Sequence, residues 1–136
     1  MNENKLELIA QFCQKVINEI YIWKQKMKVL VLGANGATGF NAVNQLLKSG
    51  FEVKAVTRNV GKFTEMGNHP QLEVIQAGIT EIDNQTLTNY LSDVDAVISC
   101  LGHNISIKGI FGKPRRLVTD SLIKIINSIN PAKKVK

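Results

Sequence analysis

A run of four apolar residues followed by three regularly spaced glycines constrains the fold of this chain more than any other feature. Val29-Leu30-Val31-Leu32 leads directly into Gly33-Ala34-Asn35-Gly36-Ala37-Thr38-Gly39. A short continuous apolar run is typical of a strand that is covered on both faces, as in a parallel sheet. Apolar residues at helical spacing follow from Asn41 to Ser49, so the glycines lie between a buried strand and a helix.

The alternation of strands and helices continues along the chain. Gly50 ends the first of these helices and suits a left-handed C-cap. Further strands are expected at 53–57, 72–77 and 96–101, with helices at 86–91 and 117–129. The last helix presents one apolar face, made of Val118, Leu122, Ile125, Ile126 and Ile129. This order favours an α/β fold with a doubly wound parallel sheet, helices on both faces and right-handed crossovers.

The first 26 residues form a separate unit, and residues 27–136 form the α/β domain. Apolar residues recur at helical spacing from Leu6 to Trp23, which predicts an amphipathic helix. Asn4 and Glu7 resemble a capping box at its start. We expect the apolar stripe to pack on the following domain or on a second copy of the chain. Membrane attachment is disfavoured because the polar face mixes Glu with Lys.

The glycine spacing suits a phosphate-binding turn. Gly33 permits a tight turn after the strand, Gly36 lets the backbone approach a pyrophosphate, and Gly39 permits close packing of the helix. Free N–H groups at the helix start face the phosphate, aided by the helix dipole, and Thr38 adds a hydroxyl donor. A glycine-rich turn without a ligand is the alternative, and an ATP-type loop is disfavoured because its lysine is missing. The candidate cofactor-binding residues of the loop are Gly33, Asn35, Gly36, Ala37, Thr38 and Gly39.

The end of the second strand bears on the choice of cofactor. A site for NAD usually has Asp or Glu there to hold the ribose hydroxyls, whereas this chain has Arg58. A guanidinium binds a 2′-phosphate in bidentate fashion, so the sequence favours NADP over NAD. Thr57 adds a hydroxyl and Lys62 is a weaker candidate, while Glu52 precedes the strand and lies at the wrong end of the sheet. An arginine paired with a surface carboxylate is the alternative interpretation.

The end of the fourth strand is the other place where a cofactor is expected. Ligands of doubly wound sheets lie outside the carboxyl ends of the strands, which here brings in Leu101 and Gly102. His103 follows, but a histidine with no identified orienting carboxylate is more often a loop residue than a catalyst. His69, beside a proline, is expected to be structural or exposed.

From Met27 onward the chain resembles the N-terminal portion of an atypical short-chain dehydrogenase/reductase. The resemblance is to the NAD(P)H-binding group that includes NmrA-like proteins and flavin reductases of the biliverdin reductase B type. The segments MKVLVLGANGATGF, VTRN and DAVISCLGH carry it. It implies a Rossmann-like fold with NADP in the cleft. It also implies backbone contacts to the cofactor near Gly33, Gly36, Ala37, Thr38, Gly39, Arg58, Leu101 and Gly102.

Two departures distinguish the chain from this family. Where relatives commonly have Gly-Asp after the third strand, with the aspartate near adenine, Gly78 is followed by Ile79. Many relatives use a Tyr-x-x-x-Lys pair as proton donor and its activator. Neither Tyr21 nor Tyr90 has a lysine four residues on, so the catalytic residues are unknown.

Composition and charge exclude several other classes of protein. With 44% apolar and 21% charged residues, the 136-residue chain suits one folded domain. Residues 107–136 carry a net charge of +7 and the rest of the chain −1, which gives +6, and no aromatic residue after Phe111 is present to stack on bases. We therefore expect solvated surface there and no specific nucleic-acid site. Cys13 and Cys100 have no partner at metal-ligand spacing, so no metal and two reduced thiols are expected.

Membrane insertion and export are not expected either. No apolar run approaches the roughly 18 residues of a membrane span. The early Glu3 and Glu7 argue against a targeting presequence, which leaves the cytoplasm as the expected location.

The leading hypothesis is an NADP(H)-binding domain of an oxidoreductase. Hydride would pass between nicotinamide and an unidentified small organic or flavin-like substrate. The alternatives are a non-catalytic sensor of NADP(H), favoured by the missing catalytic pair, and an inactive fragment. Lys133 to Lys136 fall where a fifth strand would begin, so we expect the sheet to be truncated after the fourth strand and its helix.

Overall fold

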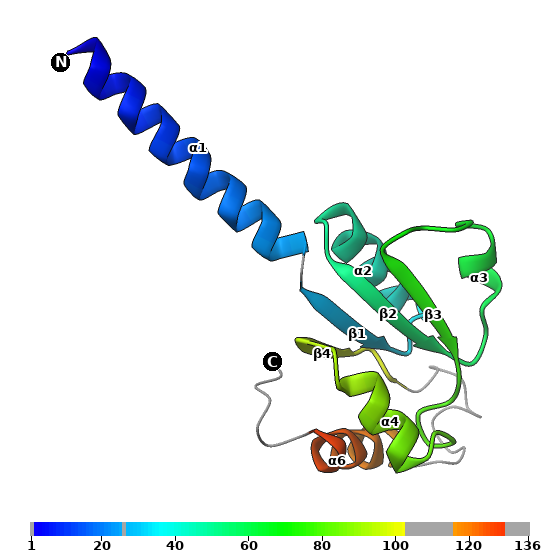
Figure 1. Cartoon of the computed structure of the whole chain (residues 1–136). Coiled ribbons are helices and arrows are strands. Elements are labelled where there is room, and N and C mark those ends of the chain that lie inside the picture. Colours follow the sequence, from blue (N-terminus) through cyan, green and yellow to red (C-terminus); the bar gives the residue numbers. More distant parts are fainter. Residues whose placement is uncertain (1, 26, 103–115, 130–136) are drawn as a thin grey trace.

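A four-stranded sheet carries helices on both faces, and a long helix projects from the end of the sheet at which the first strand begins (Figure 1). The structure is a computed structural model that describes residues 2–25, 27–102 and 116–129. In chain order the elements are α1 (Glu3–Gln25), β1 (Lys28–Leu32), α2 (Ala37–Lys48), β2 (Glu52–Thr57), α3 (Gly61–Thr64), β3 (Leu72–Gln76), α4 (Asn84–Leu91), β4 (Ala96–Ser99) and α6 (Leu117–Ser128).

The sheet has the order β3-β2-β1-β4, and all of its strand pairs are parallel. In register, Val31 of β1 lies between Ala55 of β2 and Ile98 of β4. Because parallel strands run in the same direction, the carboxyl ends of β1, β2 and β4 lie side by side at one end of the sheet. The prediction of a parallel, Rossmann-like sheet is confirmed.

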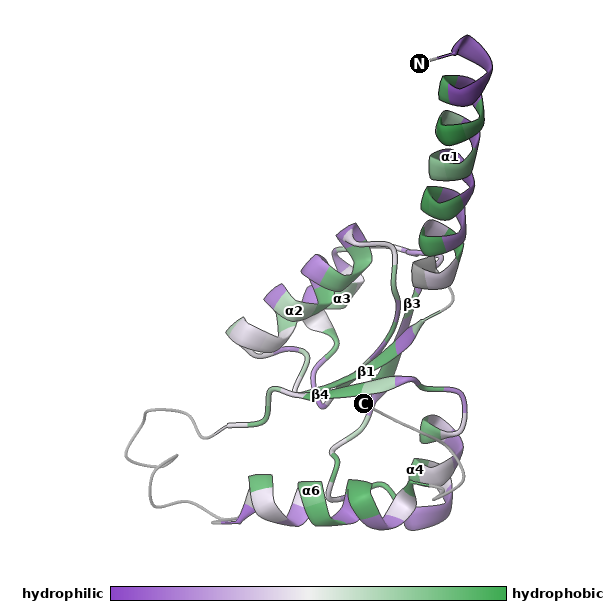
Figure 2. Ribbon diagram, turned by 90° about the vertical axis from the view of Figure 1, so that its left-hand side faces the viewer, coloured by the Kyte–Doolittle hydropathy of each residue, from purple (hydrophilic) through white to green (hydrophobic). Residues whose placement is uncertain are grey.

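The two faces of the sheet bury separate apolar clusters. The upper cluster lies under α2 and α3 and includes Val31, Val43 and Phe63. The lower cluster lies against α4 and α6 and includes Leu32 and Leu87. Figure 2 shows the sheet between these two helical layers. Successive side chains of β1 point to opposite faces of the sheet and therefore enter the two clusters in turn, which is why β1 is apolar from Val29 to Leu32.

Several helix boundaries differ from the sequence-based expectation. Helix α2 begins at Ala37, four residues earlier than its apolar spacing indicates, so that the last glycine of the loop lies inside it. Helix α4 begins at Asn84, where Asp83 accepts hydrogen bonds from the Thr86 hydroxyl (2.6 Å) and N–H (2.9 Å). These bonds lower the pKa of Asp83. The predicted C-cap is confirmed, since Gly50 has a φ of +83°.

The buried face of α6 is not the predicted one. Val118, Leu122 and Ile126 are exposed. Ser121, Ile125 and Ser128 are buried, and Ile125 belongs to the lower cluster. The reason is tertiary: the ammonium of Lys124 donates to the carbonyls of Ile79, Thr80 and Ile82, which turns that side of the helix toward the loop after β3. The predicted apolar face is therefore wrong in all but Ile125 and the half-buried Ile129.

Helix α1 also departs from expectation. It begins at Glu3, and the carbonyl of Asn2 accepts from the N–H of Lys5 (2.9 Å), so Asn4 lies inside the helix and the predicted capping box is wrong. Residues 3–23 are all exposed, and the helix extends away from the sheet (Figure 1). It does not pack on the following domain. No helix in the described parts of the chain is both long and apolar enough to cross a membrane.

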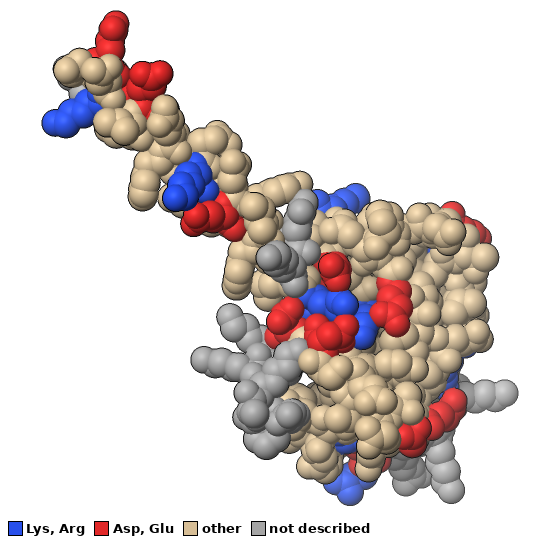
Figure 3. All heavy atoms as spheres, viewed as in Figure 1, with Lys and Arg blue, Asp and Glu red and all other residues tan. Residues whose placement is uncertain are grey.

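Five charged side chains gather at the amino ends of the strands (Figure 3). Asp93 is the centre of this network: its carboxylate lies 2.7 Å from the ammonium of Lys28 and 2.6 Å from that of Lys54. Glu52 and Glu73 complete it. Burial disfavours ionisation of Asp93, but the hydrogen bonds from the two lysines outweigh it and lower its pKa to about 2. The bond to Asp93 likewise raises the pKa of Lys28, against desolvation.

We expect Asp93→Asn to destabilise the protein at pH 7 by about 1 kcal/mol, because the half-exposed carboxylate is partly screened by solvent. The pKa of Asp93 is lower in the folded state than in the unfolded state, so its ionised carboxylate stabilises the fold above about pH 4. This stabilisation is lost as the pH falls toward 2. Urea denaturation at several pH values should show the difference between wild type and variant shrinking below about pH 4. Glu65→Gln, at an exposed carboxylate, is the control and should show no such trend; a difference independent of pH would contradict the assignment.

Candidate functional site

The glycine loop lies at the carboxyl ends of the strands and is anchored on both sides. The N–H of Ala34 donates to the carbonyl of Val56 on β2 (3.2 Å). The N–H of Cys100, directly after β4, donates to the carbonyl of Leu32 (2.9 Å). The loop closes through a bond from the Gly36 N–H to the Gly33 carbonyl (3.1 Å). Its position is therefore set by strands on either side of β1.

Two of the three glycines are explained by the packing of the chain itself. Gly33 has a φ of +69°, and a Cβ there would lie 2.9 Å from the Cys100 carbonyl oxygen. A Cβ on Gly39 would lie 2.3 Å from the Gly33 oxygen and 2.9 Å from the Cα of Ala34. The first position needs glycine for its turn and the second for the close approach of α2, as their spacing predicted.

Gly36 is different, because no described residue requires a glycine there. Its φ is −64°, it is exposed, and among the described residues the heavy atom near an added Cβ is the Gly33 oxygen at 3.4 Å. A methyl group would instead occupy the space outside the loop. That space lies in front of the N-terminus of α2, which begins at the next residue.

The N-terminus of α2 presents unpaired donors to this space. Gly36 is the N-cap and offers no side chain, and the first turn holds no acidic residue. The first N–H groups of a helix have no partner within it, so those of Ala37 and Thr38 face outward with the positive end of the helix dipole. Both residues are exposed. This arrangement suits an anion such as a phosphate.

Asn35 adds an unsatisfied acceptor to the loop. Its side-chain oxygen Oδ1 is buried and has no hydrogen-bond partner among the described residues. A buried polar atom left without a partner costs roughly 1–3 kcal/mol, so such atoms usually meet a ligand or a water. Its backbone carbonyl accepts from the ammonium of Lys62 (3.0 Å).

Lys62 lies closer to the loop than the sequence indicated. It belongs to the four-residue helix α3, which carries too few residues for a periodic signal and was not predicted. Its ammonium reaches Asn35 and lies 5.4 Å from the centre of the Phe40 ring. In the sequence, the residue that could have indicated the turn into α3 is Asn59, because its side chain accepts from the Gly61 N–H (2.9 Å).

Thr57 and Arg58 end β2 beside this cation. The Thr57 hydroxyl is buried and donates to the carbonyl of Asn59 (3.0 Å), so its proton is used inside the turn. The Arg58 side chain is exposed, and no described residue forms an ion pair or hydrogen bond with its guanidinium. The alternative of an arginine paired with a surface carboxylate is thus not observed in the described parts of the chain.

The end of β4 approaches the loop through backbone atoms. Burial raises the pKa of the Cys100 thiol, which suits a packing group rather than a nucleophile. Leu101 is half-buried beside the lower cluster and Gly102 is exposed. A Cβ on Gly102 would meet no atom of a described residue within 4 Å. His103 lies outside the described residues, and His69 accepts from the Gln71 N–H (3.2 Å) in a local turn.

The described residues contain no catalytic or metal-binding constellation. Within the described ranges, no three His, Cys, Asp or Glu side chains are grouped so as to hold a metal. Tyr90 lies on α4 and Tyr21 on α1, both away from the glycine loop. Where the family has an acidic residue near adenine, Ile79 is buried in the lower cluster.

A parallel sheet in this strand order, with a glycine turn and an uncapped helix N-terminus at its carboxyl edge, defines a Rossmann-type dinucleotide-binding domain. Residues 33–135 match the NAD(P)H-binding family. The chain belongs to this NAD(P)H-binding family of atypical short-chain dehydrogenase/reductases.

Individual relatives agree with this assignment. A stretch of 76 residues is 41% identical to an uncharacterized chloroplastic protein of Arabidopsis thaliana, covering 55% of this chain and 27% of that protein. The Bordetella bronchiseptica enzyme WbmF, solved in complex with NADH, is 22% identical and aligns with a TM-score of 0.64 over 82% of this chain and 34% of its own. An epimerase of Methanothermobacter thermautotrophicus aligns at 17% identity with a TM-score of 0.60, over 80% of this chain and 34% of that one.

These two solved structures share the fold with this chain, and their low identity supports nothing finer. The chain spans between 27% and 34% of the length of the three proteins. The match to the NAD(P)H-binding family supports a nicotinamide dinucleotide as the ligand class, without a distinction between NAD and NADP.

Proposed function

We propose that this chain binds NADP(H) at the glycine loop and presents its nicotinamide for hydride transfer. The observation that carries the proposal is the open space at Gly36 in front of the uncapped N-terminus of α2. A pyrophosphate there accepts from the N–H groups of Ala37 and Thr38. The unpartnered Oδ1 of Asn35 fits a hydroxyl donor of the same ligand. The residues present thus fit a dinucleotide.

The preference for NADP rests on two cations beside the loop. Arg58 is exposed without a partner among the described residues, and Lys62 reaches the loop carbonyl of Asn35. A 2′-phosphate carries extra negative charge that these groups attract, and no carboxylate at the end of β2 repels it. Thr57 contributes by holding the turn that presents Arg58, since its hydroxyl bonds to Asn59.

When bound, the nicotinamide supplies or accepts a hydride, and the protein positions it. The backbone of the loop fixes the phosphates, and Leu101 and Gly102 at the end of β4 lie on the nicotinamide side of the cleft. We propose a small organic or flavin-like molecule as the partner in hydride transfer. No residue is assigned to proton transfer.

A non-catalytic sensor of NADP(H) is the second candidate. It is favoured by the positions of Tyr21 and Tyr90, neither of which lies at the loop or has a lysine four residues on. Steady-state oxidation of NADPH against quinones, flavins and aldehydes separates the two. Turnover supports the enzyme, whereas micromolar binding without turnover on any acceptor supports the sensor.

The cytoplasmic location of this chain stays a prediction.

We expect Arg58→Glu to weaken NADPH binding by roughly 1.5–3 kcal/mol, the range for a lost charge-assisted hydrogen bond. NADH lacks the 2′-phosphate, so its affinity should stay within about twofold. Isothermal titration calorimetry of both cofactors with wild type and variant measures this. Lys5→Glu on α1 makes the same change in net charge far from the loop and should leave both affinities unchanged. Equal losses for NADPH and NADH would overturn the role of Arg58 in the choice of cofactor.

A further inference from the structure

Helix α1 carries an apolar stripe that the described residues leave uncovered. Phe12 is 68% exposed and Ile17 is 58% exposed, although side chains of this size are normally buried. Ten large apolar side chains of α1 are exposed in this way. At about 1.5 Å per residue the helix is roughly 34 Å long, so the stripe is too large to be an incidental surface feature.

The stripe follows a heptad pattern without a break. Its central positions alternate in steps of three and four residues, at Leu6, Ile9, Cys13, Val16, Ile20 and Trp23. Steps of three and four keep the residues on one seam of a left-handed coiled coil, where they occupy the a and d positions. Phe12 and Ile17 lie on either side of the seam, at a g and an e position. Leu8, Tyr21 and Ile22 lie outside it.

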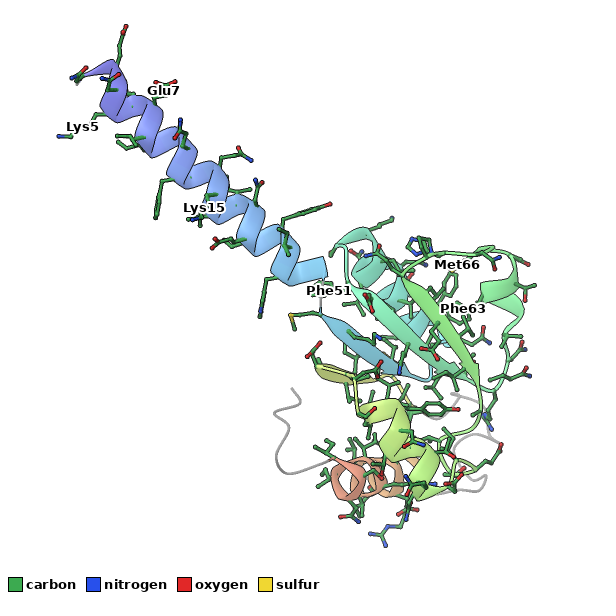
Figure 4. All side chains as sticks on the ribbon, in the orientation of Figure 1. Lys5, Glu7, Lys15, Phe51, Phe63 and Met66 are labelled. Carbon is green, nitrogen blue, oxygen red and sulfur yellow. The ribbon has the colours of Figure 1, made fainter. Side chains whose placement is uncertain are left out.

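The opposite face of α1 is mainly polar and close to neutral, with the apolar Leu8, Tyr21 and Ile22 lying toward its ends. It holds Glu7, Gln11, Lys15 and the pair Gln14 and Asn18, which share a hydrogen bond of 3.1 Å on the exposed surface. Figure 4 shows Lys5, Glu7 and Lys15 directed away from the rest of the protein. A helix that binds an anionic membrane surface normally carries a strongly basic face, which α1 lacks. The charge pattern favours a protein partner.

We propose that the occupant of this stripe is α1 of a second copy of the chain, paired in parallel and in register. Eight side chains on each helix, six on the seam and two beside it, would remove on the order of 1,200 Å² from water, the lower limit for a stable specific interface. The proposal is independent of the proposed cofactor.

The flanking residues decide between the two orientations. In a parallel pair, the g residue of one helix faces the next e residue of the other, so Phe12 meets Ile17 of the second copy. In an antiparallel pair with the same seam, g faces g, and Phe12 meets Glu19 instead. The first arrangement buries two exposed apolar side chains together, whereas the second buries an aromatic ring beside a carboxylate.

Cys13 reports the orientation directly. At an a position of a parallel pair, the two Cys13 residues face each other at a separation of about 6 Å between Cα atoms, which is within the range for a disulfide. In the antiparallel pair each Cys13 faces Val16. Diamide provides the test: each disulfide formed oxidises two thiols, and the two electrons and two protons pass to one diamide molecule.

The experiment uses the full chain. We expect sedimentation equilibrium to give twice the chain mass for wild type, and a single chain mass for Ile9→Glu and Val16→Glu on the seam. Gln11→Glu and Asn18→Glu on the polar face are matched controls for helix propensity and charge and should keep the doubled mass. Diamide should give a covalent dimer with wild type and Cys100→Ser, and none with Cys13→Ser.

Four outcomes would overturn the proposal. They are a wild-type chain of single mass, a doubled mass that survives both seam variants, a doubled mass in which Cys13 does not cross-link, and a single-mass chain that binds vesicles of phosphatidylcholine and phosphatidylserine through α1. Because none of these readouts involves a nucleotide, the result is separate from that of the cofactor titrations.

Discussion

Gly39→Ala is expected to lower the free energy of unfolding by about 3 kcal/mol or more. The added Cβ would lie 2.3 Å from the Gly33 oxygen and 2.9 Å from the Cα of Ala34, and both are backbone atoms that no side-chain rotation can move. Overpacking of this kind typically costs about 1–3 kcal/mol, and a backbone contact this short belongs at or beyond the upper end. Urea denaturation followed by far-UV circular dichroism measures the loss.

Gly36→Ala is the matched control, because it adds the same methyl group three residues earlier in the same loop. Among the described residues its Cβ meets just the Gly33 oxygen, at 3.4 Å, and its φ of −64° suits alanine. We expect its stability to stay within about 0.5 kcal/mol of wild type. If the space belongs to a dinucleotide, calorimetry should show weaker NADPH binding by this folded variant. Equal unfolding midpoints for the two alanine variants would contradict the packing role assigned to Gly39.

Leu87→Ala is expected to destabilise the protein by about 3 kcal/mol. Leu87 is 1% exposed and lies in the lower cluster between α4 and the sheet, so the shorter side chain leaves a cavity there. Leucine-to-alanine changes in cores cost about 2–5 kcal/mol. Alanine has at least the helix propensity of leucine, so the loss reports packing rather than formation of α4. Urea denaturation of the full chain measures the change.

Gln85→Ala tests the same helix without touching the cluster. Gln85 is exposed and contributes only a surface hydrogen bond to Asn89 (3.4 Å). Its stability should stay within about 0.5 kcal/mol of wild type. A similarly small effect of Leu87→Ala would mean that α4 is not held to the sheet through this side chain.

The conformation of the glycine loop was largely predictable because the features that determine it are local. Gly33 and Gly39 serve the turn and the close helix approach that their spacing indicates, and Gly50 takes the left-handed conformation of a C-cap. Each of these requirements acts between residues near in sequence or on adjacent strands of a regular sheet. Of the three loop glycines, only Gly36 has no packing reason among the described residues to be glycine, which agrees with the different role that its spacing predicted.

The position of Lys62 beside the glycine loop could be found only from the structure. Lys62 belongs to α3, whose single turn is too short for apolar periodicity, and it reaches Asn35 across 27 residues of sequence. Thr57 was expected to offer its hydroxyl to a phosphate, and the structure instead uses that proton to hold the turn after β2. The acceptor lies only two residues on, so this bond is local, but a threonine hydroxyl can bond either its own backbone or a ligand, and composition and spacing do not distinguish the two.

The amino-acid sequence by itself determined the parallel sheet, the alternation of its strands with α2, α4 and α6 along the chain, and the glycine turn at the carboxyl ends of the strands. Continuous apolar runs, helical spacing and glycine positions are properties of short segments, so they can be recognised without knowledge of the whole fold. Only the tertiary structure decided which helix faces are buried. In α6 the contacts of Lys124 with the loop after β3 outweigh an apolar stripe, and in α1 the stripe meets no described surface of its own chain. Burial depends on partners distant in sequence, and an amphipathic pattern specifies a face without specifying what covers it.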